Sequence, residues 1–375
     1  MNILHVFRAP VGGLFRHVLD LTREQVARGH CVGIVADSIT GGSRAAEVFH
    51  QLAPQLALGI TRIPMRRHAN ASDFSALGHV IHRAKETNAD VVHGHGAKGG
   101  AFARLVVGAK RAVRAYTPHG GSLLFGHDTL AGRFYLSTEK LLMLRGDLFL
   151  FESAYSEAIF RRKIGNPHGL VRIVHNGVSR AEFEPIVLRP DATDLMFIGE
   201  LRPVKGIDVL IDAIALLHRE GRSVTATLVG DGPDRAALAA QVERNNLARA
   251  VRFMPAMPAR EAQALGWVMV APSRAESLPY VVLEAAAAGK PLITTNVGGI
   301  PEIYGPLSDR LVPPLDAPAL AKAIKRALDH PDEAADTAQK LRKRVAASFS
   351  VDSMVDGVLE AYAISVELLR AAGRR

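Results

Sequence analysis

The fold is decided by residues 268–285, which read VMVAPSRAESLPYVVLEA. The apolar run 268–271 predicts a buried strand, and the apolar stretch that begins near Tyr280 predicts a helix, with a polar loop between them. Ser277 is a residue type that caps helices, and Pro279 suits a first helical turn, where a missing N–H costs nothing. A strand, a loop and a helix in this order form the repeating unit of a parallel sheet covered by helices.

The same alternation of short apolar runs and amphipathic stretches extends over the whole chain. It is interrupted between 182 and 194 by Pro185 and Pro190, so we expect a linker there. The sequence therefore predicts an α/β fold with two Rossmann-like, doubly wound domains that face each other across a cleft. The predicted divisions are an N-terminal domain at 1–185, a C-terminal domain at 186–350 and a final helical segment at 351–375.

Basic residues are concentrated in the first half of the chain. Residues 1–180 hold 23 Lys and Arg against 12 Asp and Glu, a net charge of +11, whereas residues 181–375 hold 23 against 25, a net charge of −2. The asymmetry indicates an anionic partner for the first half: a phospholipid surface, a lipid pyrophosphate or nucleic acid. A solvated basic surface is the alternative. Aromatic residues make up only 6% and do not alternate with basic ones, which argues against nucleic acid.

No segment of this 375-residue sequence holds the roughly 18 consecutive apolar residues that a membrane-spanning helix needs. The apolar start Met1–Phe7 is too short for a signal peptide and is followed by Arg8, so we expect a cytoplasmic protein. Cys31 is the single cysteine, which excludes a disulfide within the chain and predicts a small buried side chain.

Two glutamates and a helix start carry the chemistry of the second half. The amides of Leu278 to Val281 would point towards the cleft with the positive end of the helix dipole, which suits a diphosphate. Glu276 precedes those amides and Glu284 lies within the helix. A carboxylate accepts paired hydrogen bonds from neighbouring hydroxyls, so one glutamate can hold a hexose and the other a ribose. Both could instead be simple partners of the helix dipole.

Basic and glycine-containing loops follow other predicted strands of the second half. Arg202 and Lys205 lie on a strand-to-helix loop, where cations can neutralise a phosphate as it leaves. Gly230 ends another strand and opens a helix. Basic loop residues are also common without any such role, and glycines of this kind can be plain turn residues.

Histidines and glycines mark the strand ends of the first half. His119 lies between Pro118 and two glycines at a strand end, so we expect it to reach the cleft. Gly13 permits close approach of a phosphate or sugar, although the dinucleotide-binding glycine pattern is incomplete. His93 and His95 raise the question of a metal, but no further Cys, Asp or Glu with ligand spacing accompanies them, so we predict no bound metal.

In order, these segments resemble the family-4 glycosyltransferases of the GT-B fold. The resemblance runs from Gly13 to Glu302, and its most specific part is the pair Glu276 and Glu284, set in Pro-Ser-x-x-Glu and followed by Ala-Gly-Lys-Pro at 288–291. It implies a retaining transfer from a nucleotide diphosphate sugar, UDP-sugar favoured over GDP-sugar, without a cofactor or a required metal. The last helix would cross back to the N-terminal domain, as in similar enzymes.

The resemblance also implies roles for single residues. Glu276 would hold hydroxyls of the donor sugar, Arg202 and Lys205 the diphosphate, and His119 would contact the transferred sugar. Many members of the family have Arg where this chain has Glu200, and Glu-Gly-Phe-Gly where it has the four residues from Glu276 to Pro279. The donor-binding residues would be Gly13, Glu284, Leu278, Pro279, Tyr280, Gly230 and Asn176, and those on the acceptor side His95 and Lys98.

The basic first half fits the family's use of lipid-linked or oligosaccharide acceptors in cell-surface polysaccharide synthesis. The apolar run 102–107 is flanked by basic residues and predicts a segment that lies on an anionic membrane surface, with the protein peripheral at its inner face. The apolar run would equally suit packing against the sheet. The flanking residues are Lys98, Arg104, Lys110, Arg111 and Arg114, and a second basic patch comprises Arg66, Arg67, Arg83 and Lys85.

Two other functions remain open at this stage. A sugar-nucleotide epimerase shares the two-domain architecture, but the first half offers no carboxylate at a strand end to work with Glu276. A non-catalytic module that binds anionic surfaces would explain the charge alone. Release of nucleotide from a sugar nucleotide distinguishes a transferase from both.

Overall fold

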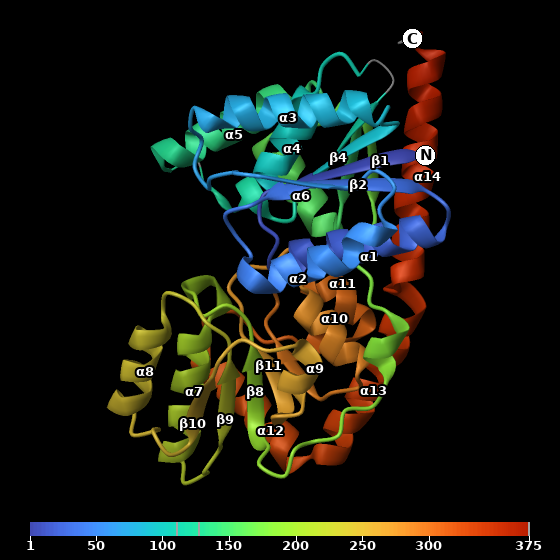
Figure 1. The fold of residues 1–375 in the computed structure, drawn as a ribbon. Helices are drawn as coiled ribbons and strands as arrows, with labels where there is room; N and C mark the ends of the chain where they lie inside the picture. Colours follow the sequence, from blue (N-terminus) through green and yellow to red (C-terminus); the bar gives the residue numbers. More distant parts are fainter. Residues whose placement is uncertain (110–111, 127, 374–375) are drawn as a thin grey trace. The chain divides into compact units, whose positions relative to one another are not determined.

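The computed structural model describes residues 1–109, 112–126 and 128–373, and the chain forms two compact units (Figure 1). Unit 1 comprises Met1–Asn176 together with Val351–Arg375, and unit 2 comprises Gly177–Ser350. The chain thus leaves unit 1 at Asn176, earlier than the predicted boundary at 185. The reason is that Arg260 of unit 2 donates hydrogen bonds to the carbonyls of Ala181 and Glu184, which fixes the expected linker to unit 2.

Unit 1 contains a parallel sheet in the order β3-β2-β1-β4-β5-β6-β7. Its strands are β1 (Asn2–Phe7), β2 (Cys31–Asp37), β3 (Ile60–Ile63), β4 (Val91–His95), β5 (Val113–Thr117), β6 (Leu148–Phe151) and β7 (Leu170–Ile173). Its helices are α1 (Gly12–Ala27), α2 (Gly42–Leu52), α3 (Ser72–Glu86), α4 (Gly96–Leu105), α5 (Leu130–Met143), α6 (Ala154–Lys163) and α14 (Val351–Ala371).

Unit 2 contains a parallel sheet in the order β10-β9-β8-β11-β12. Its strands are β8 (Thr193–Ile198), β9 (Ala226–Val229), β10 (Val251–Met254), β11 (Gly266–Ala271) and β12 (Leu292–Thr294). Its helices are α7 (Ile207–Arg219), α8 (Arg235–Arg244), α9 (Ala259–Gln263), α10 (Tyr280–Ala287), α11 (Ile300–Tyr304), α12 (Ala317–Asp329) and α13 (Pro331–Ser348). The predicted class, two doubly wound α/β domains, is confirmed.

Helix α14 completes unit 1, although it follows all of unit 2 in the sequence. Its side chains Val355, Val358 and Tyr362 are fully or almost fully buried, in one cluster with Ile3 of β1 and Val113 of β5. Burial of each such apolar side chain contributes about 1.5–3 kcal/mol. The last helix is therefore part of the hydrophobic core of unit 1.

Glycines let α4 pack directly on the backbone of the unit 1 sheet. A Cβ atom on Gly99 would lie 2.2 Å from the carbonyl oxygen of Val6 in β1, and one on Gly100 would lie 2.1 Å from the Tyr116 ring in β5. No real Cβ atom tolerates such distances, so only glycine permits this approach. The close packing fixes the start of α4, and with it His95 at the end of β4.

Most of the run 102–107, which was expected at a membrane surface, is buried instead, although Val107 is 51% exposed. Arg104 is fully buried, pairs with Glu139 at 2.8 Å and lies over the Tyr116 ring at 3.8 Å. Phe102 is buried as well, and Arg114 forms a bidentate pair with Asp147. The prediction of a docking segment here was wrong, because its charges are paired inside the unit; Lys110 and Arg111 lie outside the described residues.

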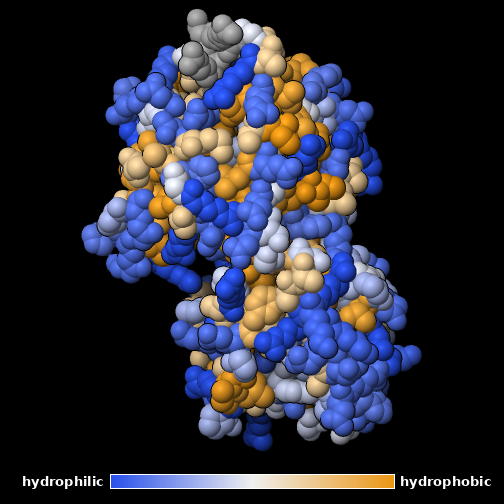
Figure 2. Space-filling model, turned by 90° about the vertical axis from the view of Figure 1, so that its right-hand side faces the viewer, coloured by the Kyte–Doolittle hydropathy of each residue, from blue (hydrophilic) through white to orange (hydrophobic). Residues whose placement is uncertain are grey.

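Among the described residues, no helix combines the length and the hydropathy that crossing a bilayer requires. On the face shown in Figure 2, hydrophobic side chains are interspersed with hydrophilic ones.

Replacement of Gly99 by Ala should lower the free energy of unfolding of unit 1 by about 3 kcal/mol, because the α4 and β1 backbones must separate. Gly78→Ala is the matched control: Gly78 lies in α3, where a Cβ atom would meet no atom of the described residues within 4 Å, so alanine should stabilise by about 1 kcal/mol. Urea unfolding followed by circular dichroism measures both. Equal effects of the two substitutions would contradict this packing.

Candidate functional site

Four loops meet at the carboxyl end of the unit 2 sheet, because parallel strands end along one edge. The loop after β11 is bonded to the loop after β8, since the Arg274 amide donates to the Val204 carbonyl at 2.8 Å. It is bonded also to the loop after β12, since the Gly299 amide donates to the Ser277 carbonyl at 2.7 Å. The loop after β8 in turn contacts Asp231 after β9.

Two glycines with positive φ hold the central loop of this group. Gly298 has φ +60°, and a Cβ there would lie 1.8 Å from the carbonyl oxygen of Glu276. Gly206 has φ +66°, and a Cβ there would lie 2.0 Å from the carbonyl oxygen of Pro272. Both positions therefore require glycine for conformation and for space. Glu276 is fixed from both sides of its loop.

The side chains of Lys205 and Glu276 form an ion pair across these loops. Lys205 Nζ lies 2.6 Å from Glu276 Oε1, and Ser273 Oγ donates to the same oxygen at 2.7 Å. Both side chains are largely but not fully covered. A cation and a carboxylate that were predicted to serve phosphate and sugar are thus brought together by loops 71 residues apart.

Arg202 has a looser position. Its side chain is 40% exposed and lies 3.3 Å from Glu200 Oε2. An ion pair this exposed contributes at most about 1 kcal/mol, so Arg202 can leave Glu200 for another anion at little cost. Glu200, which stands where many family members have Arg, thus pairs with Arg202.

Helix α10 begins at Tyr280 beside this pair. Its N-cap residue is Pro279 with extended backbone and no side-chain cap, so Ser277 is not the cap that the sequence suggested. Leu278 and Tyr280 are buried, and Glu284, one turn into the helix, is only 6% exposed. Gly230 closes the loop after β9 against the Gly199 carbonyl. These predicted donor-binding residues share one strand-end edge.

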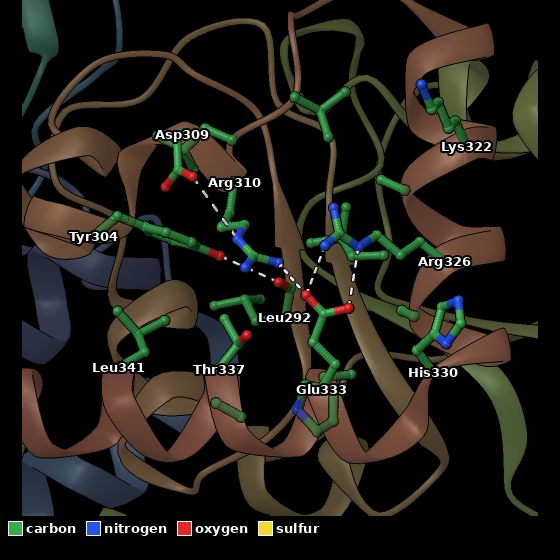
Figure 3. Close-up of a pocket in the computed structure, with 18 of the residues that line it drawn as sticks. Leu292, Tyr304, Asp309, Arg310, Lys322, Arg326, His330, Glu333, Thr337 and Leu341 are labelled. Carbon is green, nitrogen blue, oxygen red and sulfur yellow. Dashed lines mark hydrogen bonds and ion pairs between the residues drawn. The ribbon is translucent and has the colours of Figure 1, made fainter.

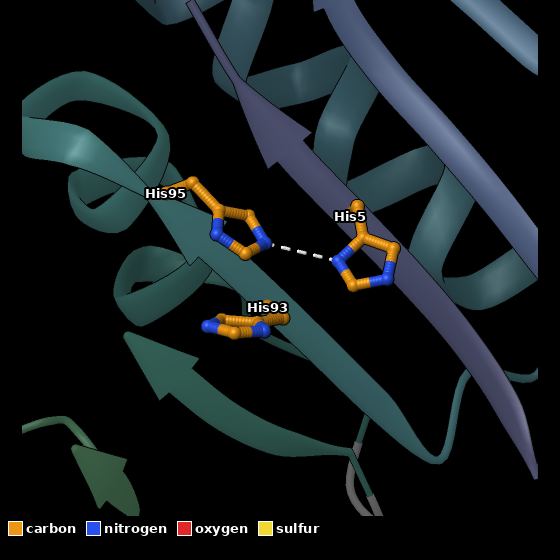
Figure 4. Close-up of side chains that lie close together, drawn as sticks. All are labelled: His5, His93 and His95. Atoms are coloured by element: carbon orange, nitrogen blue, oxygen red, sulfur yellow. Dashed lines mark hydrogen bonds between the residues drawn. The ribbon is translucent and has the colours of Figure 1, made fainter. Parts of the chain in front are cut away.

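Unit 1 brings five histidines together at the ends of its central strands. His5 of β1 lies opposite His93 of β4, with His95 two residues further along the same strand. His17 comes from α1, and its ring centroid lies 4.7 Å from that of His119, which follows β5. Figure 4 shows three members of this histidine cluster, His5, His93 and His95.

Burial keeps the cluster uncharged. Desolvation lowers the pKa of His5 to about 4 and that of His17 to about 3. The pKa values of His93, His95 and His119 are lowered well below the usual 6.5, first by desolvation and then by neighbouring histidines. Neutral imidazole rings at pH 7 can accept hydrogen bonds or bind metals.

Two groups of three within the cluster have ligand atoms close enough for one metal ion: His5, His93 and His95, and His17, His95 and His119, each within 4.8 Å. The prediction of no metal considered only His93 and His95 and therefore missed this convergence. His5 and His17 gave no signal in the sequence, because a lone histidine in an apolar strand or an amphipathic helix resembles a core residue.

Three other residues of unit 1 that were predicted to belong to the site are Asn176, Lys98 and Gly13. Asn176 Oδ1 accepts a hydrogen bond from His17 Nδ1 at 3.0 Å. Lys98 Nζ pairs with Asp73 and donates to the Arg66 carbonyl, which ties the loop before α3 to α4. Gly13 lies in the first turn of α1. Lys98 thus links α4 to the loop before α3, Asn176 contacts His17 of α1, and Gly13 lies on the same helix, four residues before His17.

A separate cavity of about 440 Å³ lies at the edge of unit 2, between α12 and α13 (Figure 3). Glu333 lies in its wall and joins Arg310 and Arg326, each at 2.7 Å. The cavity is bordered by Leu292, the first residue of β12. The loop that carries Glu276 follows the carboxyl end of a strand, whereas Leu292 lies at the amino end of its strand. The cavity is therefore not part of the site around Glu276.

Two Rossmann-like domains, with a cation, a carboxylate and a helix start at the strand ends of the second, define a GT-B glycosyltransferase. Comparison with known proteins agrees: the family described as Glycosyltransferase Family 4 matches residues 11–182, and Glycosyl transferases group 1 matches residues 192–330. The chain belongs to the family-4 glycosyltransferases.

Relatives and solved structures cover most of the chain. Glycogen synthase of Mycobacterium tuberculosis is 26% identical, over 94% of this chain and 91% of its own length. D-inositol 3-phosphate glycosyltransferase 2 of Catenulispora acidiphila is 32% identical over 52% of this chain and 48% of its own. Sucrose-phosphate synthase of Thermosynechococcus elongatus superposes with a TM-score of 0.78 at 22% identity, covering 99% and 100% of the two chains. HepE of Anabaena, solved with UDP-glucose, superposes with a TM-score of 0.79 at 20% sequence identity. The match covers 97% of this chain and 99% of the HepE chain.

The buried histidines predict acid sensitivity of unit 1. Their pKa values are lower in the folded than in the unfolded chain, so below pH 6.5 the unfolded state binds protons that the folded state does not. The free energy of unfolding should therefore fall, from pH 6.5 towards pH 4, by about 1.4 kcal/mol per pH unit for each such histidine.

Hydrogen exchange at pH 7.5, 6.5 and 5.5, corrected for intrinsic rates, measures this fall, with peptides of unit 2 as the internal reference. His17→Gln should make the dependence shallower. A free energy of unfolding of unit 1 that stays constant over this pH range would contradict the burial of these histidines in their neutral form.

Proposed function

We propose that this glycosyltransferase is retaining and metal-independent. It moves a hexose from a nucleotide diphosphate sugar, preferably a UDP-sugar, to a lipid-linked or saccharide acceptor in cell-surface polysaccharide synthesis. The contact between Lys205 and Glu276 at 2.6 Å supports this proposal most directly, because it combines a phosphate-binding cation with a hydroxyl-binding carboxylate.

Donor binding replaces one set of contacts by another. The diphosphate takes Lys205, Arg202 and the amides at the start of α10, which together balance its charge. Glu276, held by Ser273, then accepts hydroxyls of the sugar, while Glu284 accepts those of the ribose. Because the protein supplies two cations for the diphosphate, no metal is required at this position.

Transfer then proceeds on one face of the sugar. The bond between the anomeric carbon and the β-phosphate oxygen breaks, and the acceptor oxygen forms a new bond to that carbon. The acceptor's proton passes to the departing phosphate, so the nucleoside diphosphate leaves protonated. Lys205 and Arg202 stabilise the negative charge that develops as the bond breaks.

The donor and acceptor classes have separate support. HepE, which has the same fold, was solved with UDP-glucose, and this favours a UDP-sugar here. The net charge of +11 over residues 1–180 favours an acceptor that carries phosphate or lies on an anionic surface.

Helix α5 is the element of unit 1 that fits a membrane surface. Leu130, Phe134, Leu141 and Leu144 are exposed, Leu130 by 84% and Leu141 by 69%, and their spacing places them on one face at the helix and its C-cap. The exposed Lys140 lies beside this stripe. An apolar stripe on a basic unit is suited to an anionic lipid surface, and we assign it to that occupant.

Lys205→Ala and Glu276→Gln should each lower kcat/KM by about 100-fold or more, because charge stabilisation or donor orientation is lost. UDP release from UDP-glucose with an acceptor extract, measured in EDTA, gives the rates. Lys340→Ala removes a lysine from the exposed pair with Asp336 and is the matched control, with an unchanged rate. Full turnover in both site variants, or recovery of an epimerised sugar nucleotide without acceptor, would contradict the proposed site.

Leu141→Ser combined with Phe134→Ser should lower binding to liposomes containing phosphatidylglycerol by at least about tenfold, because two inserted side chains are lost. Phe74→Ser, which removes an 82% exposed aromatic from α3, should leave binding unchanged. Sedimentation at low salt measures all three proteins. If the wild type does not sediment with the liposomes, or the α3 variant loses binding equally, the assignment to α5 fails.

A further inference from the structure

A single row of hydrogen bonds runs through the histidine cluster from Gln25 to His119. His5 Nε2 lies 2.8 Å from Gln25 Oε1, and His5 Nδ1 lies 2.9 Å from His95 Nε2 (Figure 4). The other nitrogen of His95, Nδ1, lies 3.2 Å from His119 Nε2. The row joins α1, β1, β4 and the loop after β5.

The amide oxygen of Gln25 gives this row a direction. The structure places the oxygen of the Gln25 amide, and not its nitrogen, against His5 Nε2. An amide oxygen only accepts, so in this orientation the proton between Gln25 and His5 is on His5 Nε2. A neutral ring carries one proton, so His5 Nδ1 is an acceptor and His95 Nε2 must donate to it. The same argument applied to His95 makes its Nδ1 an acceptor for His119 Nε2–H. The proton positions of all three histidines thus follow from one amide.

The surroundings of the row keep it neutral. His93 bonds to Tyr362 of α14 and to Thr117 of β5, and His17 of α1 bonds to Asn176. Desolvation is the largest cause of the lowered pKa values of His93, His95 and His119, and in the described part of the chain the neighbouring groups that lower them further are other histidines. A proton added to any ring would face further imidazoles, so the single-proton state of each ring persists at pH 7.

The row ends on a residue in a constrained backbone position. His119 has φ +50°, which few residues other than glycine adopt, and it precedes the positive-φ glycines Gly120 and Gly121. With Nε2–H directed to His95, the remaining nitrogen, Nδ1, is an acceptor.

We propose that Gln25, His5 and His95 are positioning residues that fix the tautomer of His119, so that its Nδ1 accepts a hydrogen bond from a hydroxyl of the transferred sugar. This rests on the proposed function and on the role that the family resemblance implies for His119, contact with the transferred sugar. The row makes the site selective for sugars that carry a hydroxyl at that place, because a deoxy sugar leaves the acceptor nitrogen without its partner.

Histidine-selective ¹⁵N NMR of the full chain tests the row without reference to any sugar. Two-bond correlations in the imidazole rings should show His5, His95 and His119 as Nε2–H tautomers. Gln25→Glu should reverse the two links beyond His5. The new carboxylate still accepts from His5 Nε2–H and also keeps a proton on His5 Nδ1, so His95 must accept at Nε2 and donate from Nδ1, and His119 becomes the Nδ1–H tautomer. Wild-type His119 as Nδ1–H, or a variant spectrum without any tautomer change, would overturn the proposal.

Gln25→Met removes the oxygen that accepts from His5 and keeps a side chain of similar volume. It provides a second test in case the Gln25→Glu variant does not fold. Gln263→Met, the same change at a buried glutamine of unit 2, is the matched control. With UDP-glucose, Gln25→Met should lower kcat/KM at least about tenfold at an unchanged melting temperature relative to the control, because a mixture of tautomers replaces one.

Monodeoxy analogues of UDP-glucose show whether the effect acts through a hydroxyl. One analogue should react at least about tenfold more slowly than UDP-glucose with the wild type, and this preference should shrink in Gln25→Met. An equal preference in both proteins would overturn the link to the sugar. Absence of any turnover by the wild type would instead refute the proposed function, while the NMR result on the row would still stand.

A metal ion would replace the shared protons of the row. Titration with ZnCl₂ alone, followed by calorimetry, should show no site that disappears in His17→Gln. A stoichiometric zinc site that depends on His17 would make the group of His17, His95 and His119 a metal centre and would overturn the proposed row of hydrogen bonds.

Discussion

The position of Glu276 depends on the absence of a side chain at two other residues. Gly298 and Gly206 lie against the backbone of the loop that carries this glutamate, at distances that any Cβ would make impossible. Through them, the loops after β8, β11 and β12 form one packed layer at the edge of the sheet. The ion pair with Lys205 is a result of this layer, because neither flexible side chain would find the other without it.

The two units arrange polar groups in opposite ways. In unit 2 the polar groups beside α10 are charged, partly exposed and paired, so they can exchange partners when an anion arrives. In unit 1 the polar groups at the strand ends are neutral, buried and ordered by shared protons. The cations of unit 2 suit the neutralisation of a diphosphate, whereas acceptors, both the carboxylates of unit 2 and the neutral imidazoles of unit 1, suit the recognition of hydroxyls.

Much of the fold could be predicted, because the strands are short apolar runs between amphipathic helices and the pattern is local. Lys205 and Glu276 could be found for the same reason, since each lies in a loop directly after a predicted strand. His5, His17 and Gln25 could not, because they lie on separate elements and meet His95 only through the strand order. Arg104 and Lys98 were assigned to a surface because a sequence does not show that a carboxylate, Glu139 or Asp73, lies opposite on another helix. Local patterns thus predicted single elements, and the errors concern contacts between elements.

The return of the chain to unit 1 has a consequence for biosynthesis. Helix α14 is translated after the whole of unit 2, yet it supplies Tyr362 to His93 and closes one face of the first sheet. On the ribosome, unit 2 has all its strands and helices while unit 1 still exposes the apolar surface that α14 will cover. The half of the protein that is made first is therefore finished last, and its exposed surface is open to chaperones until the final helix emerges.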